Sequence, residues 1–143
     1  GPIITGKENK YKDALESYGK NLGLTFQIAD DTLDYNSDLK IFGKNIGNDF
    51  FEGKVTLPII LLFQKINDDE KMILKNLFMK DRRTDNDLNF VLNLIKNKNI
   101  INECYKKAEH YINLASNSLN IFENGEEKNI LKNLTTFSLE RNF

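Results

Sequence analysis

The sequence contains few of the residues on which several common functional classes depend. Its one cysteine, Cys104, cannot form a disulfide within the chain and fits a reducing compartment such as the cytoplasm. We expect its thiol to be buried as a small apolar group rather than to react. The one histidine, His110, has no second histidine or cysteine near it, and we interpret it as a solvated side chain rather than a metal ligand.

Long apolar runs and an excess of either charge are also absent. The longest apolar run, Ile59 to Phe63, has five residues, whereas a membrane-spanning helix needs roughly 18 or more. The 20 basic and 21 acidic residues balance, which argues against a bulk electrostatic partner such as nucleic acid or an anionic membrane surface. No signal peptide is recognisable, and the chain starts with Gly1-Pro2, as after cleavage of a tag, so we expect a fragment of a longer protein.

Apolar residues recur with the 3.6-residue period of an α-helix, and no stretch alternates with the period of two that a half-buried strand shows. The best N-terminal pattern predicts one long helix over residues 8–35. Gly19 and Gly23 lie inside it four residues apart, which suggests a neighbouring helix that packs too closely for a side chain. A helix break at Gly23 is the alternative.

The rest of the chain predicts shorter helices. Thr56 can cap a helix with Pro58 in its first turn, and residues 59–63 are apolar on every side, as in a buried helix or, alternatively, a buried strand. Further helices are expected to begin at Asp68 and Thr84 and to cover about 100–122 and 126–141. Core positions are expected in the helices that follow Asp68 and Thr84: Ile73, Leu74, Leu77, Phe78, Leu88, Val91, Leu92 and Ile95. The expected fold class is all-α, an antiparallel helical bundle with short loops.

Four polar residues near the end of the long helix share one face, because they are three or four residues apart: Gln27, Asp30, Asp31 and Asp34. The C-terminal end of a helix carries the negative end of its dipole and disfavours carboxylates. Apolar residues flank these aspartates, and buried charges need partners or a metal. A hard divalent cation resolves the conflict, and Mg²⁺ commonly bridges carboxylates and phosphate oxygens. The triplet therefore predicts a Mg²⁺ site that a diphosphate completes.

The segment 36–54 follows directly and shows no sustained period. Structureless connections longer than about 12 to 15 residues are uncommon in compact domains and are usually functional or disordered. Apolar residues within this one favour an ordered loop. Gly43-Lys44 and Gly53-Lys54 each place an ammonium beside a residue that lets backbone N–H groups approach an anion. A single such pair mostly marks a turn, but two of them directly after an acidic triplet predict a phosphate-binding loop.

A family resemblance rests on three strings that occur in order. They are Tyr18 to Tyr35 with its Asp-Asp-x-x-Asp, Gly43 to Asp49 (GKNIGND), and Gly53 to Pro58 (GKVTLP). Together they resemble the second aspartate-rich region of the trans-isoprenyl diphosphate synthases, most closely the long-chain, octaprenyl-type polyprenyl synthetases. The resemblance fades after Pro58 and covers about the C-terminal half of a full enzyme. It implies part of the isoprenoid synthase fold, with the aspartate motif at 30–34, a diphosphate loop at 36–54 and a helical scaffold at 55–143.

The resemblance also implies a reaction: the Mg²⁺-dependent condensation of isopentenyl diphosphate with an allylic diphosphate. The metal ligands that it implies are three carboxylates: Asp30, Asp31 and Asp34, with Asp30 the first choice. Gln27 is expected beside the reacting allyl group or its diphosphate, and Lys44 and Lys54 are expected to hold the allylic diphosphate. Gln27, Asp30 and Lys44 make up the expected catalytic set, and Asp49 is expected to order the loop.

The family uses two facing aspartate-rich motifs, whereas this chain has one, so we expect the isolated fragment to be inactive. Its expected partners are isopentenyl and allylic diphosphates, together with the N-terminal half of the same enzyme or a second copy in a homo-oligomer. One alternative is a catalytically silent helical subunit that only associates with a partner chain, which the intact aspartates and lysines disfavour. A related all-α terpene cyclase is the other, and the paired Gly-Lys loop disfavours it.

Overall fold

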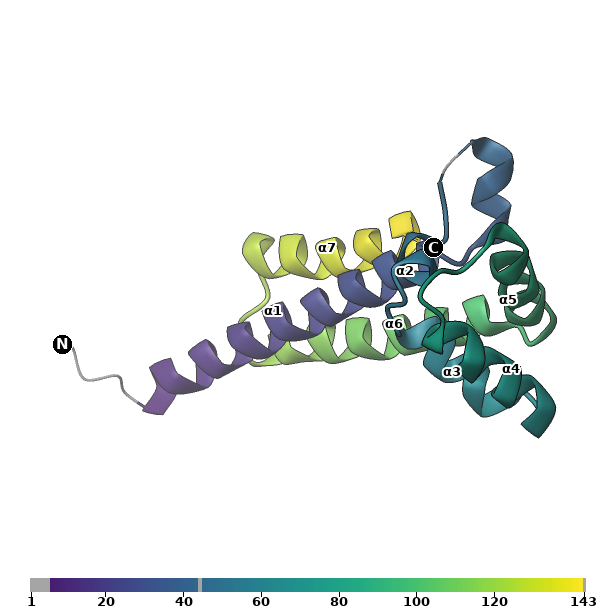
Figure 1. The fold of residues 1–143 in the computed structure, drawn as a ribbon. Helices are drawn as coiled ribbons and strands as arrows, with labels where there is room; N and C mark the ends of the chain where they lie inside the picture. Colours follow the sequence, from purple (N-terminus) through teal and green to yellow (C-terminus); the bar gives the residue numbers. More distant parts are fainter. Residues whose placement is uncertain (1–5, 44, 143) are drawn as a thin grey trace. The chain divides into compact units, whose positions relative to one another are not determined.

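The computed structural model describes residues 6–43 and 45–142, and every regular element in these ranges is helical (Figure 1). The α-helices and 3-10 helices (η) are, in chain order, α1 (Gly6–Leu33), η1 (Ser37–Phe42), α2 (Asn48–Phe51), α3 (Leu57–Lys65), α4 (Asp68–Met79), α5 (Asp85–Asn97), α6 (Ile100–Ser118), η2 (Leu119–Ile121) and α7 (Glu126–Asn142). The predicted all-α class is confirmed. No helix in these ranges is long and apolar enough to cross a membrane.

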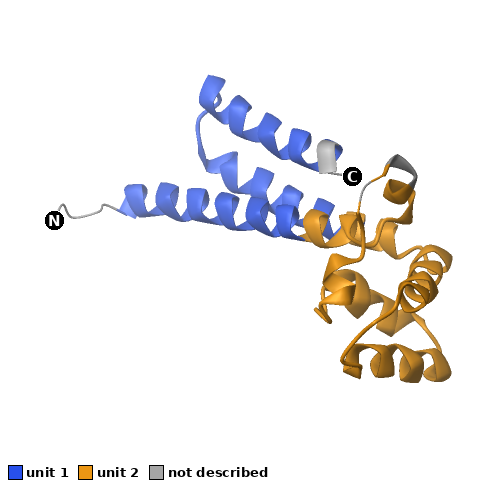
Figure 2. Ribbon diagram, turned by 45° about the horizontal axis from the view of Figure 1, so that its top comes forward, with its two compact units in different colours: residues 1–27, 106–143 blue, residues 28–105 orange. Residues whose placement is uncertain are grey.

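The chain divides into two compact units (Figure 2). Residues 1–27 and 106–143 form the first unit, which holds most of α1 and α6 together with η2 and α7. Residues 28–105 form the second, which holds the end of α1, the elements from η1 to α5 and the start of α6. The predicted aspartate motif and the loop that follows it therefore belong to one unit.

In the first unit, Tyr18 of α1 packs against Ala115 of α6 and Leu119 of η2, and all three side chains are buried. The Tyr18 hydroxyl donates a hydrogen bond of 2.9 Å to the carbonyl oxygen of Leu131 in α7. This bond satisfies a polar group inside an apolar contact, and burial raises the pKa of the hydroxyl. Tyr18 thus connects three helical elements of the unit.

Gly19 and Gly23 of α1 have no close helix contact among the described residues. Gly19 and Gly23 are exposed, and a Cβ atom built on either would meet no described atom within 4 Å. The prediction that a neighbouring helix packs against them is therefore not met by the described residues. The alternative, a break at Gly23, is wrong, because α1 continues without interruption to Leu33.

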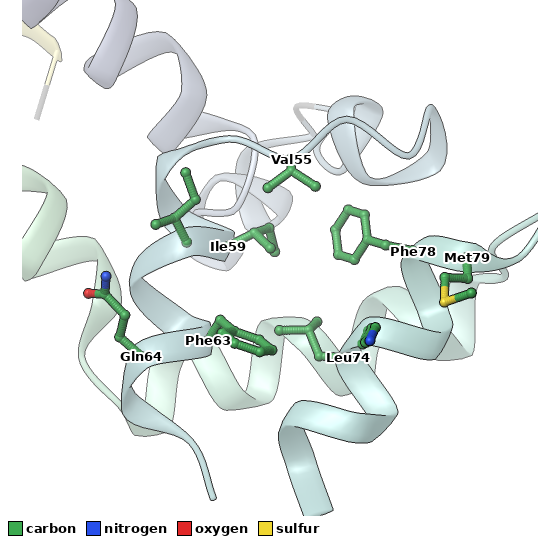
Figure 3. Close-up of a pocket in the computed structure, with 9 residues that line it drawn as sticks. Val55, Ile59, Phe63, Gln64, Leu74, Phe78 and Met79 are labelled. Carbon is green, nitrogen blue, oxygen red and sulfur yellow. The ribbon is translucent and has the colours of Figure 1, made fainter. Parts of the chain in front are cut away.

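In the second unit, α3 is buried on one side only. Its residues Ile59 and Leu62 are buried, whereas Ile60 and Phe63 are 46% and 42% exposed, so the prediction of a helix buried on every side is wrong. The exposed side faces a groove of about 500 Å³ that α3 and α4 line (Figure 3). Ile73 of α4 is also exposed, against the prediction of a core position there. Apolar periodicity indicates which residues share a face but not whether that face is covered.

The starts of α4 and α5 agree with their sequence signals. Asn67 accepts a hydrogen bond of 2.8 Å from the Glu70 N–H and returns one from its own N–H to the Glu70 carboxylate. Thr84 and Asp87 form the same reciprocal pair before α5. Each pair is a capping box, which satisfies N–H groups that a helix start leaves open. Thr56 stands at the predicted N-cap of α3, but its hydroxyl makes no capping bond.

Cys104, which was expected to be buried, and His110, which was expected to be solvated, have these environments in the structure. Cys104 of α6 is fully buried, and burial raises the pKa of its thiol to about 11, although a hydrogen bond with Thr32 of α1 opposes the shift. Thr32 itself is buried and donates to the carbonyl oxygen of Ile28. His110 is exposed. Cys104 therefore acts as a core residue where α1 and α6 meet.

Candidate functional site

The three predicted metal ligands lie where α1 ends. Asp30 and Asp31 belong to the last turn of the helix, and Asp34 follows directly after its final residue, Leu33. Asp30 is exposed and the other two aspartates are half-buried, while Tyr35 next to them is 1% exposed. The conflict with the helix dipole that the sequence indicates is thus present in the structure, because Asp30 and Asp31 lie at the negative end of α1.

Asp34 has a defined structural role in addition. Its Oδ1 accepts a hydrogen bond of 3.0 Å from the Asn48 N–H, and its Oδ2 accepts one of 2.6 Å from the Asp49 N–H. The Asp34 carbonyl oxygen accepts a third, of 2.7 Å, from the Gly47 N–H. The carboxylate accepts hydrogen bonds from N–H groups that the start of α2 leaves open, and its negative charge is favourable at the positive end of the α2 dipole. Asp34 therefore fastens the loop 36–54 to the end of α1.

A short hydrogen-bonded path leads from Asp34 to Lys54. The Asp49 N–H donates a hydrogen bond to the carboxylate of Asp34, and the Asp49 carbonyl oxygen accepts one of 2.8 Å from the Lys54 N–H. Asp49 orders the loop in this way, as expected, but through its backbone. The Lys54 side chain is exposed. The path joins the aspartate end of α1 to one of the two lysines predicted to bind a diphosphate.

Negative charge is concentrated where the end of α1 meets the start of α2. Burial raises the pKa of Asp49, and the charge of Asp34 raises it further, while Lys54 opposes the shift. Burial also raises the pKa of Tyr35 far above its ordinary value, and the charges of Asp34, Asp49 and Asp31 add to this effect. Nearby carboxylates disfavour further negative charge. The region therefore favours the arrival of a cation.

Three glycines hold the loop in backbone conformations that other residues rarely adopt. Gly47, the N-cap of α2, has φ +86, and Gly53, directly before Lys54, has φ +74. A Cβ atom on Gly47 would approach the Leu88 side chain to 2.6 Å. Gly43 has φ +74 but open space around it. The glycines of this loop are therefore required by backbone geometry, in addition to any role in anion binding.

Two further residues predicted for the site, Gln27 and Lys44, are not part of this hydrogen-bonded path. Lys44 lies outside the described residues. Gln27 is exposed on α1 and falls in the first unit, whereas the aspartates and Lys54 belong to the second. The structure thus brings Asp34, Asp49 and Lys54 together by hydrogen bonds, while metal binding by the aspartates and substrate binding by Gln27, Lys44 and Lys54 stay predictions.

The donor set suits a cation that takes further ligands from elsewhere. Among residues 6–43 and 45–142, no three or more His, Cys, Asp or Glu side chains are grouped closely enough to enclose a metal ion. Asp34 already accepts two backbone hydrogen bonds, whereas Asp30 is exposed at the end of α1. Mg²⁺ characteristically uses one or two carboxylates and completes its shell with waters and phosphate oxygens. The carboxylates therefore fit Mg²⁺ together with a phosphate ligand.

Sequence reasoning missed one residue of this region, Arg83. It follows α4, and its guanidinium donates to the carbonyl oxygen of Phe51, 32 residues away. Its charge also lowers the pKa of Tyr35, against the larger effects that raise it. No local signal separates Arg83 from its neighbour Arg82, because the contact depends on chain folding over a long distance.

Comparison with known proteins now gives the family. The model of the family described as polyprenyl synthetase matches residues 1–95. The chain belongs to the polyprenyl synthetase family. The match extends well beyond Pro58, where the resemblance seen in the sequence alone fades, and it includes the aspartate motif, the loop and helices α3 and α4.

Several relatives of this polyprenyl synthetase chain are similar over almost its whole length. An all-trans-nonaprenyl-diphosphate synthase (geranyl-diphosphate specific) from Rhodobacter capsulatus is 32% identical over 97% of this chain and 42% of its own length. An octaprenyl diphosphate synthase from Haemophilus influenzae is 28% identical over 99% of this chain and 43% of its own. The chain thus spans about two fifths of the length of these relatives.

Solved structures of family members agree in fold. A polyprenyl synthase from Caulobacter crescentus, complexed with calcium and isoprenyl diphosphate, matches with a TM-score of 0.80 and 33% identity, over 92% of this chain and 40% of that one. A decaprenyl diphosphate synthase from Rhodobacter capsulatus matches with a TM-score of 0.79 and 27% identity, over 93% and 40%. The helical arrangement described here therefore occurs within larger all-α enzymes.

Proposed function

We propose that this chain supplies the second aspartate-rich region of a polyprenyl diphosphate synthase, which condenses isopentenyl diphosphate with an allylic diphosphate. The observation that carries the proposal is the bonded path from Asp34 through Asp49 to Lys54. This path joins a carboxylate-rich helix end to a lysine-bearing turn. Carboxylates that bind a divalent cation and a lysine that binds an anion are the two requirements of a metal–diphosphate site.

Each residue has a proposed task in this reaction. Asp30 and Asp31 would hold Mg²⁺, and Asp34 would keep the loop closed against them. The ion would neutralise charge on the diphosphate, which makes it a better leaving group. Lys54, with Lys44, would bind the same diphosphate, and Gln27 would lie beside the allyl group. Positioned charges of this kind commonly give the largest part of the rate enhancement in such reactions.

The choice of cation rests on the chemistry of the ligands. The Caulobacter crescentus relative is described with calcium and isoprenyl diphosphate, which supports a divalent cation in this family. Calcium takes six to eight oxygen ligands, whereas Mg²⁺ is commonly coordinated by one or two carboxylates and keeps several of its waters. Asp30 and Asp31 offer few protein ligands, so we propose Mg²⁺ as the working ion.

Because the chain spans about two fifths of its relatives, we propose that turnover needs further residues of the kind those relatives contain. They would come from an N-terminal half of the same enzyme, or the chain would act within a homo-oligomer. In this proposal residues 30–34 bind the metal, 36–54 bind the diphosphate and 55–143 form the scaffold. The similar proteins are named as prenyl diphosphate synthases, which does not favour a catalytically silent subunit. A cytoplasmic location stays a prediction from the single cysteine.

The experiment that tests the function is a complementation assay. The chain is mixed with an N-terminal half taken from a relative, and elongation of a labelled allylic diphosphate by isopentenyl diphosphate is followed with Mg²⁺ present. We expect turnover from the mixture, none from the chain alone, and none when Asp30→Asn is used. Full activity of the Asp30→Asn mixture would contradict the proposed role of the aspartates.

A further inference from the structure

Arg83 connects two segments that are distant in the sequence. Its Nη1 donates hydrogen bonds of 3.1 and 2.7 Å to the carbonyl oxygens of Leu77 and Lys80, at the end of α4. Its Nη2 donates a bond of 3.3 Å to the carbonyl oxygen of Phe51, the last residue of α2. The first two bonds satisfy carbonyl groups that a helix end leaves open. The third bond satisfies such a carbonyl group at the end of α2, and it is the one that joins the two segments.

The guanidinium also lies directly against the turn that carries Lys54. A Cβ atom on Gly53 would come within 2.8 Å of Arg83 Nη2, so the missing side chain of Gly53 leaves the room that the guanidinium occupies. Gly53 has φ +74 and donates its N–H to the Phe50 carbonyl oxygen, which makes a tight turn immediately before Lys54. Arg83 therefore supports this turn from one side, while Asp49 binds its Lys54 N–H.

The geometry of these bonds requires an arginine. Three carbonyl acceptors on two segments are reached by one planar group whose N–H donors point in fixed directions. A lysine ammonium is a compact charge on a flexible stem and does not reproduce this fork. Arg82, directly before it in the chain, is exposed, which makes it a matched control with the same charge.

We propose that Arg83 is a positioning residue for diphosphate binding, which fixes the turn from Phe51 to Lys54 so that the Lys54 ammonium meets the diphosphate. The inference rests on the proposed function, because it assigns Arg83 a task at that same site. In this role Arg83 acts through Lys54 and not by contact with the substrate. It lowers the cost of ordering Lys54 when the anion arrives, since a preorganised side chain loses less freedom on binding.

An arginine that only stabilised the fold, without an effect on Lys54, would give a different result when anion affinity is measured. Because two of the three bonds are made to the end of α4, loss of Arg83 lowers stability in either case, and stability alone decides nothing. The informative quantity is the affinity for an anion, measured while each variant is folded. If Arg83 acts through Lys54, its removal has no further effect once Lys54 is gone.

The test is calorimetric titration of inorganic diphosphate in the presence of Mg²⁺, with folding checked by circular dichroism at the same temperature. The variants are Arg83→Ala, Arg82→Ala, Lys54→Ala and the double variant Arg83→Ala/Lys54→Ala. We expect Arg83→Ala to weaken binding about three- to tenfold and Arg82→Ala to leave it nearly unchanged. The double variant should bind no more weakly than Lys54→Ala.

Two results would overturn the inference: Arg83→Ala binding as tightly as Arg82→Ala, or the losses of Arg83→Ala and Lys54→Ala multiplying in the double variant. If Arg83→Ala does not fold, Arg83→Lys takes its place, since it keeps the charge but lacks the fork. Its affinity should then fall, and an unchanged affinity would count against the positioning role. Absence of diphosphate binding by the wild type would instead contradict the proposed function, and this inference with it.

Discussion

At the scale of single residues, the aspartates of the triplet have different tasks. Asp34 accepts two backbone hydrogen bonds and closes the loop, whereas Asp30 is exposed at the end of α1. From their spacing in the sequence alone, the three aspartates are equivalent. Only the fold distinguishes them, because the N–H groups that Asp34 binds come from residues 14 and 15 positions later.

This difference gives the first prediction. Asp34→Ala should lower the free energy of unfolding by about 1 to 2 kcal/mol, because it removes a charged cap of α2. Asp30→Ala should change it by less than about 0.5 kcal/mol, as for an exposed residue. Urea unfolding of the two variants measures both values. Equal losses in the two variants would show that Asp34 has no special structural role.

Cys104 provides a second prediction at this scale. The thiolate is the reactive form of cysteine, and burial keeps the Cys104 pKa at about 11, so almost no thiolate exists at neutral pH. We expect iodoacetamide to leave the folded chain unmodified and to modify it readily in denaturant. Mass spectrometry after timed quenching measures the two rates. Similar rates in both conditions would contradict the buried position.

At the scale of elements, helices were predictable where their signals are local. The starts of α4 and α5 follow from capping residues within four positions, and the buried face of α5 follows from its period: Leu88, Val91, Leu92 and Ile95. The short helices η1 and α2 were not predicted within the loop. A four-residue helix has little stability of its own, and α2 depends on Asp34 from outside the loop.

The residues of the candidate site were also predictable only in part. The aspartates and Lys54 could be named from the sequence because their order along the chain matches a family pattern. Arg83 could not, because its contact with Phe51 spans 32 residues and its neighbour Arg82 has the same local context. Exposure was also not predictable, as Ile60 and Phe63 show, because the period does not tell what covers a helix.

The start of α5 gives a prediction with a pH dependence. The Lys80 ammonium lies 2.6 Å from Asp87 Oδ2, and this bond, with the Thr84 N–H, holds the pKa of Asp87 below its ordinary value of 3.8. A lowered pKa in the folded state means that the stabilisation is present above 3.8 and is lost as the pH falls through the folded value. Asp87→Asn should therefore be less stable than the wild type at neutral pH, and the two should converge in acid.

The control for this prediction is Asp85→Asn, which changes a carboxylate in the same helical turn but outside the capping box. Thermal unfolding over a pH series compares the three proteins. We expect Asp85→Asn to show a smaller and salt-sensitive loss, because it affects only the helix dipole. A difference between Asp87→Asn and the wild type that persisted in acid would contradict the electrostatic explanation.

At the scale of the whole molecule, apolar side chains remain on the surface of the first unit. Ile130 of α7 is 58% exposed, and Phe26 of α1 is 44% exposed. Monomeric proteins rarely leave large contiguous apolar patches open to water. We expect the chain to self-associate in a concentration-dependent way, which multi-angle light scattering measures. Ile130→Lys should weaken the association, whereas Asn129→Lys, at an exposed polar neighbour, should not. A uniform monomer at all concentrations would contradict this expectation.

The central claim is that the end of α1 and the loop fastened to it bind a divalent cation and a diphosphate together. Calorimetric titration of inorganic diphosphate into the chain, with and without Mg²⁺, tests it most directly. The variants compared with the wild type are Asp30→Asn/Asp31→Asn and the control Asp81→Asn, at an exposed acidic residue outside the site. We expect binding only with Mg²⁺, in the wild type and the control, and its loss in the double variant. Equal heats with and without Mg²⁺, or equal heats for the wild type and the double variant, would contradict the claim.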